Sequence, residues 1–229
     1  MSDNSTSNKR IAKNTIFLYI RMFFVLLVSL FTTRIVLQTL GVIDYGIYNV
    51  VAGFVSMFAF LNTSMSNGIQ RFYNFQMGCN DTGNITKVYN TALQIQSLIA
   101  LILLILLETF GLWYINSQMI IPADRLNAAQ WIFQFSVLSL IIIVIQVPYS
   151  AAIMAHEKMQ FYSYISIVEV IAKLAIAYSL LIVKQDKLII YGLLSLIVTV
   201  IIFTVNYSYA KIKFSDLKFR LSWNKDYFK

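Results

Sequence analysis

The chain has 229 residues, of which 59% are hydrophobic and only 12% are charged, whereas about a quarter of the residues in a typical soluble domain are charged. With only 8 Gly and 2 Pro, the hydrophobic residues stand in long runs, and this composition excludes a soluble globular domain and a disordered chain. The single cysteine excludes an intrachain disulfide. The cations behind the net charge of +8 are scattered between the apolar runs and form no basic face, so the charge does not indicate nucleic-acid binding.

Six apolar runs are long enough to cross a membrane, which requires about 20 residues at a rise of ~1.5 Å per residue. In chain order they are residues 15–33, 47–65, 94–114, 132–152, 165–183 and 188–207. We expect an all-α polytopic membrane protein with a cytoplasmic arm at 1–14, a six-helix transmembrane lobe at 15–210 and a basic cytoplasmic tail or inter-lobe linker at 211–229. The connections are short, so neighbouring helices should be antiparallel, with no room for a catalytic domain outside the membrane.

The distribution of lysine and arginine predicts the orientation of the chain. An even number of spans places both termini on one side, and the side with more cations is the cytoplasmic one. Twelve cations lie on the side of the termini: Lys9, Arg10, Lys13, Arg71, Lys87, Lys158, Lys211, Lys213, Lys218, Arg220, Lys225 and Lys229. Only four lie on the opposite side, namely Arg34, Arg125, Lys184 and Lys187. Both termini are therefore expected in the cytoplasm.

Ionisable residues within the apolar runs are candidate functional residues, because a charge at the centre of a membrane helix costs about 2.5–3.5 kcal/mol. Glu169 and Lys173 are four residues apart in the fifth run, so they share one helix face. They form either a self-neutralising pair buried between helices or a functional pair, with Lys173 binding substrate and Glu169 coupling an ion. Arg21 shares a face with Ser29 and Thr32, and is either a snorkelling anchor near the interface or a cation within a polar cavity.

Polar side chains also follow the end of the second run and the start of the third. Asn67 and Gln70 share a helix face, Arg71 comes next, and Gln94 begins the third run. Lipid does not tolerate such a stretch, so these side chains either line a water-filled cavity or bond neighbouring helices to one another. The predicted substrate-binding or cavity residues are therefore Arg21, Asn67, Gln70, Arg71, Gln94 and Lys173.

Signatures of enzymes are mostly missing from the sequence. One His and one Cys cannot build a zinc site, and we find no phosphate-binding Gly-rich loop and no serine nucleophile elbow. We therefore expect no catalytic residues, no metal and no cofactor.

Two groups of residues at the ends of predicted spans carry a resemblance to a known family. The first is Leu-Gly-Val-Ile-Asp-Tyr-Gly-Ile-Tyr at residues 40–48, followed by Arg-Phe-Tyr at 71–73. The second is Val-Pro-Tyr at 147–149, continuing to Ala-His-Glu-Lys-Met at 155–159. Together with six spans in this order, they resemble Wzx-type polysaccharide flippases, a branch of the multidrug, oligosaccharidyl-lipid and polysaccharide exporter superfamily.

The resemblance implies a bacterial inner-membrane transporter. Its substrate would be an undecaprenyl-pyrophosphate-linked oligosaccharide, moved from the cytoplasmic to the periplasmic leaflet for surface polysaccharides such as lipopolysaccharide O-antigen or capsule. Such exporters have two six-helix lobes around a central cavity, whereas this chain supplies one lobe, and Trp-Asn-Lys at 223–225 resembles the linker before the seventh helix. The chain is then a truncated product, half of a split gene or a half-size protein that dimerises. Expected partners are the lipid-linked oligosaccharide, membrane lipids, a second lobe or second copy, and polysaccharide synthesis proteins, but no nucleic acid.

Two alternative functions stay open. A drug or metabolite antiporter of the same superfamily would hold cationic substrates with acidic residues, and the cationic candidate set disfavours it. A non-transporting membrane scaffold for polysaccharide synthesis belongs to another class, and it would move no substrate in proteoliposomes.

Overall fold

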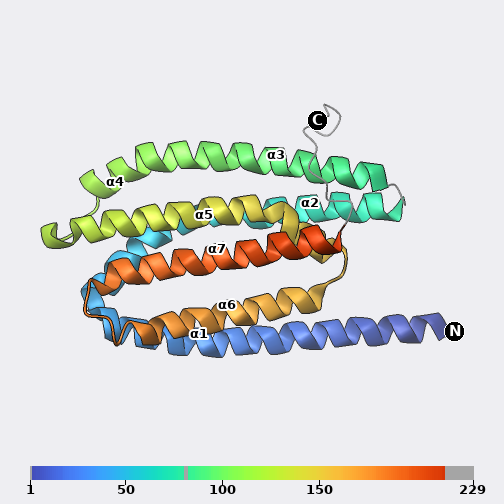
Figure 1. Cartoon of the computed structure of the whole chain (residues 1–229), viewed down its shortest axis with the longest axis horizontal. Helices are drawn as coiled ribbons and strands as arrows, with labels where there is room; N and C mark the ends of the chain where they lie inside the picture. Colours follow the sequence, from blue (N-terminus) through green and yellow to red (C-terminus); the bar gives the residue numbers. More distant parts are fainter. Residues whose placement is uncertain (1, 80–81, 215–229) are drawn as a thin grey trace.

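The computed structural model describes residues 2–79 and 82–214, and it forms a bundle of helices without strands in these ranges (Figure 1). The α-helices are α1 (Ser2–Ser56), α2 (Phe60–Gly78), α3 (Thr82–Leu106), α4 (Leu112–Ser117), α5 (Leu126–Ala155), α6 (Met159–Ser179) and α7 (Lys187–Lys213). Two 3₁₀ turns, η1 (Met57–Ala59) and η3 (Ala123–Arg125), and one π turn, η2 (Leu107–Gly111), join some of them. Most of the predicted basic tail lies outside the described residues.

Five helical stretches among the described residues are long and apolar enough to cross a membrane, so the chain is a multi-pass helical membrane protein. They are Thr15–Gly78, Ile85–Ser117, Ala123–Ala155, Met159–Ser179 and Lys187–Lys213. The last four each contain most of one predicted span. The first contains two, because helix continues through the segment expected to separate residues 15–33 from residues 47–65.

The backbone of this first stretch changes direction at Gly41. Its φ of 80° and ψ of 170° lie outside the helical region, and a residue with a side chain rarely adopts such a φ. Figure 1 shows α1 running from its N-terminus to the far end of the bundle, where the chain turns and returns through α2. A bend centred on one glycine therefore stands where the sequence predicted a loop.

The connections alternate between the two ends of the bundle. The start of α1, the end of α7, the α2–α3 connection and the α5–α6 connection lie at one end (Figure 1). The bend at Gly41, the α4–α5 connection and the α6–α7 connection lie at the other end, which we call the bend end. Helix α5 is central, since it packs against α1, α2, α3 and α7 and carries Ile132, Phe133 and Val137, which are fully buried.

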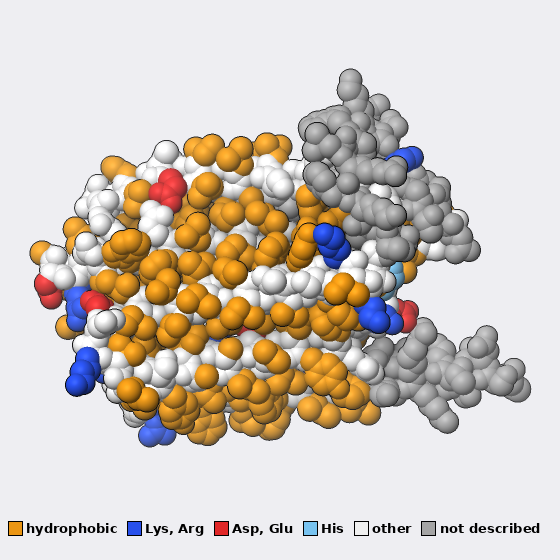
Figure 2. All heavy atoms as spheres, in the orientation of Figure 1, with side chains coloured by type: hydrophobic (Ala, Val, Ile, Leu, Met, Phe, Trp, Pro, Cys, Tyr) orange, Lys and Arg blue, Asp and Glu red, His pale blue; other side chains and the backbone are white. Residues whose placement is uncertain are grey.

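The outer surface of the bundle is apolar. Figure 2 shows hydrophobic side chains over the middle of the visible face, with lysine and arginine mainly toward the two ends. Large side chains such as Phe23, Leu30 and Phe31 on α1 are more than 60% exposed. Soluble proteins rarely expose apolar patches of this extent, whereas a bilayer would cover them.

Gly111, in the π turn η2, provides a test of the packing between α3 and α5. A Cβ atom at Gly111 would lie 2.6 Å from Cζ of Phe133, whose ring is completely buried. We therefore expect Gly111→Ala to lower the free energy of unfolding by about 1–3 kcal/mol, as overpacked cores do. Unfolding by sodium dodecyl sulfate in detergent micelles measures the change.

The matched control is Gly53→Ala on α1, where a Cβ atom would meet nothing within 4 Å. This substitution should leave stability unchanged or raise it by up to about 1 kcal/mol, because alanine favours helix over glycine. Equal stability of the two variants would contradict the close approach of η2 to α5.

Candidate functional site

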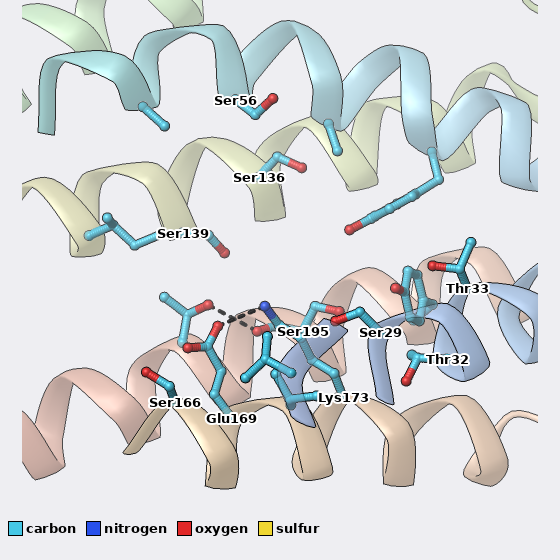
Figure 3. Close-up of a pocket in the computed structure, with 18 of the residues that line it drawn as sticks. Ser29, Thr32, Thr33, Ser56, Ser136, Ser139, Ser166, Glu169, Lys173 and Ser195 are labelled. Carbon is cyan, nitrogen blue, oxygen red and sulfur yellow. Dashed lines mark hydrogen bonds and ion pairs between the residues drawn. The ribbon is translucent and has the colours of Figure 1, made fainter. Parts of the chain in front are cut away.

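A cavity of about 950 Å³ opens between α1, α5, α6 and α7, and we call it the polar cavity. Its volume lies within the range of about 300–1,000 Å³ that is typical of ligand sites. Three of the ionisable residues singled out in the sequence line it, namely Arg21 on α1 and both Glu169 and Lys173 on α6. Figure 3 shows the polar side chains of these helices around this space.

Glu169 and Lys173 form an ion pair along one turn of α6, where Lys173 Nζ donates to Glu169 Oε1 at 2.7 Å. The side chains of Lys173 and Glu169 are 47% and 37% exposed, respectively. The pair is therefore not sealed between helices, which was one of the two interpretations of its spacing. Instead it stands in the lining of the polar cavity, where a ligand can reach both groups (Figure 3).

Arg21 joins α1 to α6 at another part of the polar cavity. Its Nη1 donates to Oγ of Ser166 at 3.4 Å, and its guanidinium lies 4.9 Å from the ring centroid of Tyr162. Its Nε is buried and has no hydrogen-bond partner. A guanidinium has five N–H donors, and Arg21 makes one side-chain hydrogen bond, so further N–H groups on its two Nη atoms are left for a ligand.

The electrostatic balance of the polar cavity favours an anion. Among the described lining residues there are two cations and one carboxylate, and Lys173 already neutralises Glu169. Arg21 makes no ion pair with any described carboxylate, so it carries the net positive charge of the lining. Planar, bidentate recognition of phosphate or carboxylate is the interaction for which arginine is best suited.

Hydroxyl groups make up much of the remaining polar lining, and most were not singled out in the sequence. Ser29 and Thr32, which share the stripe of Arg21, do line the cavity. Others come from α1, α5 and α7, namely Tyr48, Ser136, Ser139, Tyr191, Ser195 and Thr199. The signal that could have revealed them is the spacing of three or four residues between hydroxyls in otherwise apolar runs, which places each pair on one helix face.

The polar residues of α2 and α3 do not line the polar cavity. Asn67 and Arg71 are exposed, while Gln70 and Gln94 are half-buried, and Oε1 of Gln94 is buried without a partner. These helices pack against α5 and against each other, whereas α6 packs mainly against α1 and α7. This bundle therefore does not bring these four positions together with Arg21 and Lys173, because α5 separates the two groups of helices.

Arg125 connects three elements at the bend end of the bundle. Its Nε lies 3.1 Å from Oδ1 of Asp44, and its Nη1 donates to Oδ2 of Asp186 at 2.8 Å. The other oxygen of Asp186 accepts the backbone N–H of Leu188 at 3.0 Å and so caps α7. Asp44, Arg125 and Asp186, which we call the charge clamp, thus hold α1 beyond its bend, the start of α5 and the start of α7 together.

Glu108 is an acidic residue within a membrane-spanning stretch that sequence analysis did not single out. It lies in η2, and Gln134 Nε2 on α5 donates to its Oε2 at 3.0 Å. It does not line the polar cavity. Across the described residues, no three His, Cys, Asp or Glu side chains form a group that could hold a metal ion.

Cysteine labelling tests whether Arg21 and Ser29 face water. In a Cys79→Ser background, which removes the native cysteine, Arg21→Cys and Ser29→Cys should react with a membrane-impermeant maleimide in isolated membranes. The control is Ile20→Cys, because Ile20 is 60% exposed but lies outside the cavity lining, so we expect it to face lipid and to stay unlabelled. Equal protection of all three positions would show that the cavity is closed to water.

Comparison of the chain with family models, with curated proteins and with solved structures gave no match. The motifs at the span junctions and the composition of the polar cavity are therefore the basis for assigning a function.

Proposed function

We propose that the chain is a six-helix lobe of a Wzx-type flippase that moves a lipid-linked oligosaccharide across a bacterial inner membrane. The observation that carries this proposal is the polar cavity, in which Arg21, the Glu169–Lys173 pair and many hydroxyls face a space of about 950 Å³ between membrane-spanning helices. The resemblance of the motifs at 40–48 and 147–159 gives the substrate class, an undecaprenyl-pyrophosphate glycan.

The path of the backbone supports one lobe of such an exporter. The helical arms before and after Gly41 run in opposite directions. Five continuous helical stretches are long enough to cross a membrane. If the two arms of the first stretch are counted as separate crossings, the number of crossings becomes six. An even number of crossings is consistent with Figure 1, in which the start of α1 and the end of α7 lie at the same end of the bundle. A second lobe or a second copy of this chain would complete a two-lobe transporter.

The chemistry of the polar cavity is suited to a diphosphate carrying sugars. The unused donors of Arg21 can bind phosphate oxygens in a bidentate manner, and serine and tyrosine hydroxyls can hydrogen-bond to a glycan. Lys173 can join them when Glu169 takes up a proton or a sodium ion and releases the ammonium group. Substrate binding and ion binding would then be coupled through one turn of α6.

The charge of the polar cavity also separates this proposal from its rivals. An antiporter for cationic drugs needs unpaired carboxylates, whereas the one carboxylate in the described lining is already paired with Lys173. A scaffold needs no water-accessible cavity at all. The proposal therefore requires both a translocation activity and its dependence on Arg21.

Reconstitution into proteoliposomes tests the proposed function. A fluorescent short-chain prenyl diphosphate disaccharide is placed in both leaflets, and translocation is measured as loss of protection from an impermeant glycosidase. The wild-type chain should expose the inner pool, and Arg21→Gln should not, while Arg34→Gln outside the cavity should behave as wild type. No translocation by the wild-type chain would favour the scaffold, and proton-driven export of a cationic dye would favour the antiporter.

Reporter fusions test the orientation that this function requires. Because twelve cations are assigned to the side of the termini and four to the other, an alkaline phosphatase fused after Lys229 should be inactive. The same reporter inserted between residues 116 and 125 should be active in the periplasm. An active fusion after Lys229 would overturn the topology and, with it, the direction of transport.

A further inference from the structure

A second cavity, of about 340 Å³, lies between α2 and α3 and shares no lining residue with the polar cavity. We call it the α2–α3 groove. Its walls are apolar, with Met65, Ile69 and Phe72 on α2 and Val88 and Ile95 on α3. Gly68 also lines it, and a Cβ atom there would meet nothing within 4 Å, so the absent side chain helps to keep the groove open.

Two cations extend the groove toward the α2–α3 connection. Lys87 lies four residues before Thr91, and Arg71 lies three residues after Gly68, so each continues a helix face that lines the groove. Both side chains are exposed, and Arg71 makes no ion pair with any described carboxylate. The connection lies at one end of the bundle (Figure 1), and Arg71 and Lys87 lie within two turns of the helix ends that it joins. We expect both cations near the membrane surface at that end.

Thr91 supplies a polar group in the α2–α3 groove, between Lys87 at its outer end and the apolar Ile95 further in. Helical threonines normally donate to the carbonyl four residues earlier, as Thr32 and Thr39 do at 2.8 and 2.7 Å. Thr91 Oγ1 is buried and has no partner, although the residue lines the groove. Buried hydroxyl groups in proteins almost always donate to a hydrogen-bond acceptor, so a bound ligand with an acceptor would satisfy this one. It lies one helical turn deeper than Lys87.

We propose that the α2–α3 groove binds one anionic phospholipid from the leaflet next to the α2–α3 connection. The order of groups in the groove matches the order along such a lipid. Arg71 and Lys87 stand where the phosphate would lie, Thr91 where an ester carbonyl would accept its proton, and the apolar walls where an acyl chain would run. Basic pockets between membrane helices are typical binding sites for anionic head groups.

The dimensions of the groove favour a bilayer phospholipid over a prenyl lipid. The lining of α2 extends from Ser64 to Phe72, which corresponds to about 12 Å along the helix. That length is close to half of a hydrocarbon core of about 30 Å, the depth of one leaflet. A prenyl phosphate also lacks the ester carbonyl that Thr91 would need. The site is therefore distinct from the substrate site in the polar cavity, and its existence does not depend on the proposed transport function.

Native mass spectrometry of the full chain in detergent tests the head-group contacts. The chain is offered equal amounts of phosphatidylglycerol and phosphatidylcholine, and the bound lipid is identified by mass. Wild type should retain phosphatidylglycerol preferentially, and Arg71→Gln should weaken retention about fivefold and Arg71→Gln with Lys87→Gln about thirtyfold, at roughly 1 kcal/mol per cation. Arg34→Gln with Lys184→Gln removes two cations near the bend end and should change nothing.

Blocking the groove tests the position of the acyl chain. Gly68→Leu should abolish retention of phosphatidylglycerol, and Thr91→Val should weaken this retention several-fold. The control is Gly53→Leu, at another glycine where a Cβ atom would meet nothing within 4 Å, and it should leave retention unchanged. Melting temperature and elution volume confirm that each variant is folded.

Three results would overturn the proposal. The first is equal retention of the two phospholipids, and the second is unchanged binding to Gly68→Leu. The third is displacement of phosphatidylglycerol by equimolar prenyl phosphate or by a second copy of the chain, which would assign the groove to substrate or to an interface between copies.

Discussion

Arg125→Met is expected to lower the free energy of unfolding by about 3 kcal/mol. The substitution leaves the carboxylate of Asp44, whose side chain is only 9% exposed, without its cation. Breaking a buried ion pair by removing one partner typically costs about 3–5 kcal/mol, and the lower end applies here because Arg125 is itself one-third exposed. Unfolding by sodium dodecyl sulfate in micelles gives the value.

Two further variants test whether the loss of stability comes from the broken ion pair of the charge clamp rather than from removal of the Arg125 side chain itself. Asp44→Asn combined with Arg125→Met should recover part of the lost stability, because no uncompensated charge is left buried. Asp186→Asn should cost less than about 1 kcal/mol, since Asp186 is 33% exposed and asparagine is an equally good helix cap. If Arg125→Met costs no more than Asp186→Asn, the pairing of Arg125 with Asp44 does not hold the bend in place.

Lys173→Met should lower translocation of a prenyl diphosphate glycan by about tenfold or more while changing stability by less than about 1 kcal/mol. A hydrogen bond to a charged group contributes about 1.5–3 kcal/mol to binding, and Lys173 is one of two cations in the described lining of the polar cavity. The ion pair with Glu169 is half-exposed, so its loss affects folding little. Translocation in proteoliposomes and unfolding in micelles measure the two effects separately.

The double variant Glu169→Gln with Lys173→Met distinguishes transport from structure at this pair. If the pair only stabilises α6, the double variant should translocate normally, because an uncharged pair of similar volume replaces it at little cost. If the pair binds substrate and couples an ion, the double variant should reach normal amounts in the membrane and translocate no glycan. Normal translocation by a well-expressed double variant would remove both residues from the candidate site.

Local sequence was sufficient to predict the class of structure and several features of single helices. The excess of apolar residues and the length of their runs predicted a multi-pass helical membrane protein, and the described helices agree. The spacing of Glu169 and Lys173 predicted that they share a face of α6, where they form an ion pair. Both features follow from the period of the α-helix, which depends only on neighbours along the chain.

The path of the chain near Gly41 was harder to foresee. The bounds of the first two apolar runs left residues 34–46 as a connection between two spans, but the structure keeps helix on both sides of one glycine with a positive φ. A bend of this kind depends on how the two arms pack against α5, α6 and α7, and on the ion pair between Asp44 and Arg125. Hydropathy records the length of the apolar runs and carries no information about such contacts.

The grouping of polar faces was decided only by the tertiary structure. Helical periodicity places Asn67 and Gln70 on one face of α2 and Arg21 and Ser29 on one face of α1, but it does not state which faces meet. The packing of α2 and α3 against one side of α5 sends the first pair away from the polar cavity, while α6 and α7 close around the second pair. The rotation of each helix is fixed by close packing of side chains from distant parts of the chain, and a pattern read along one helix cannot contain that information.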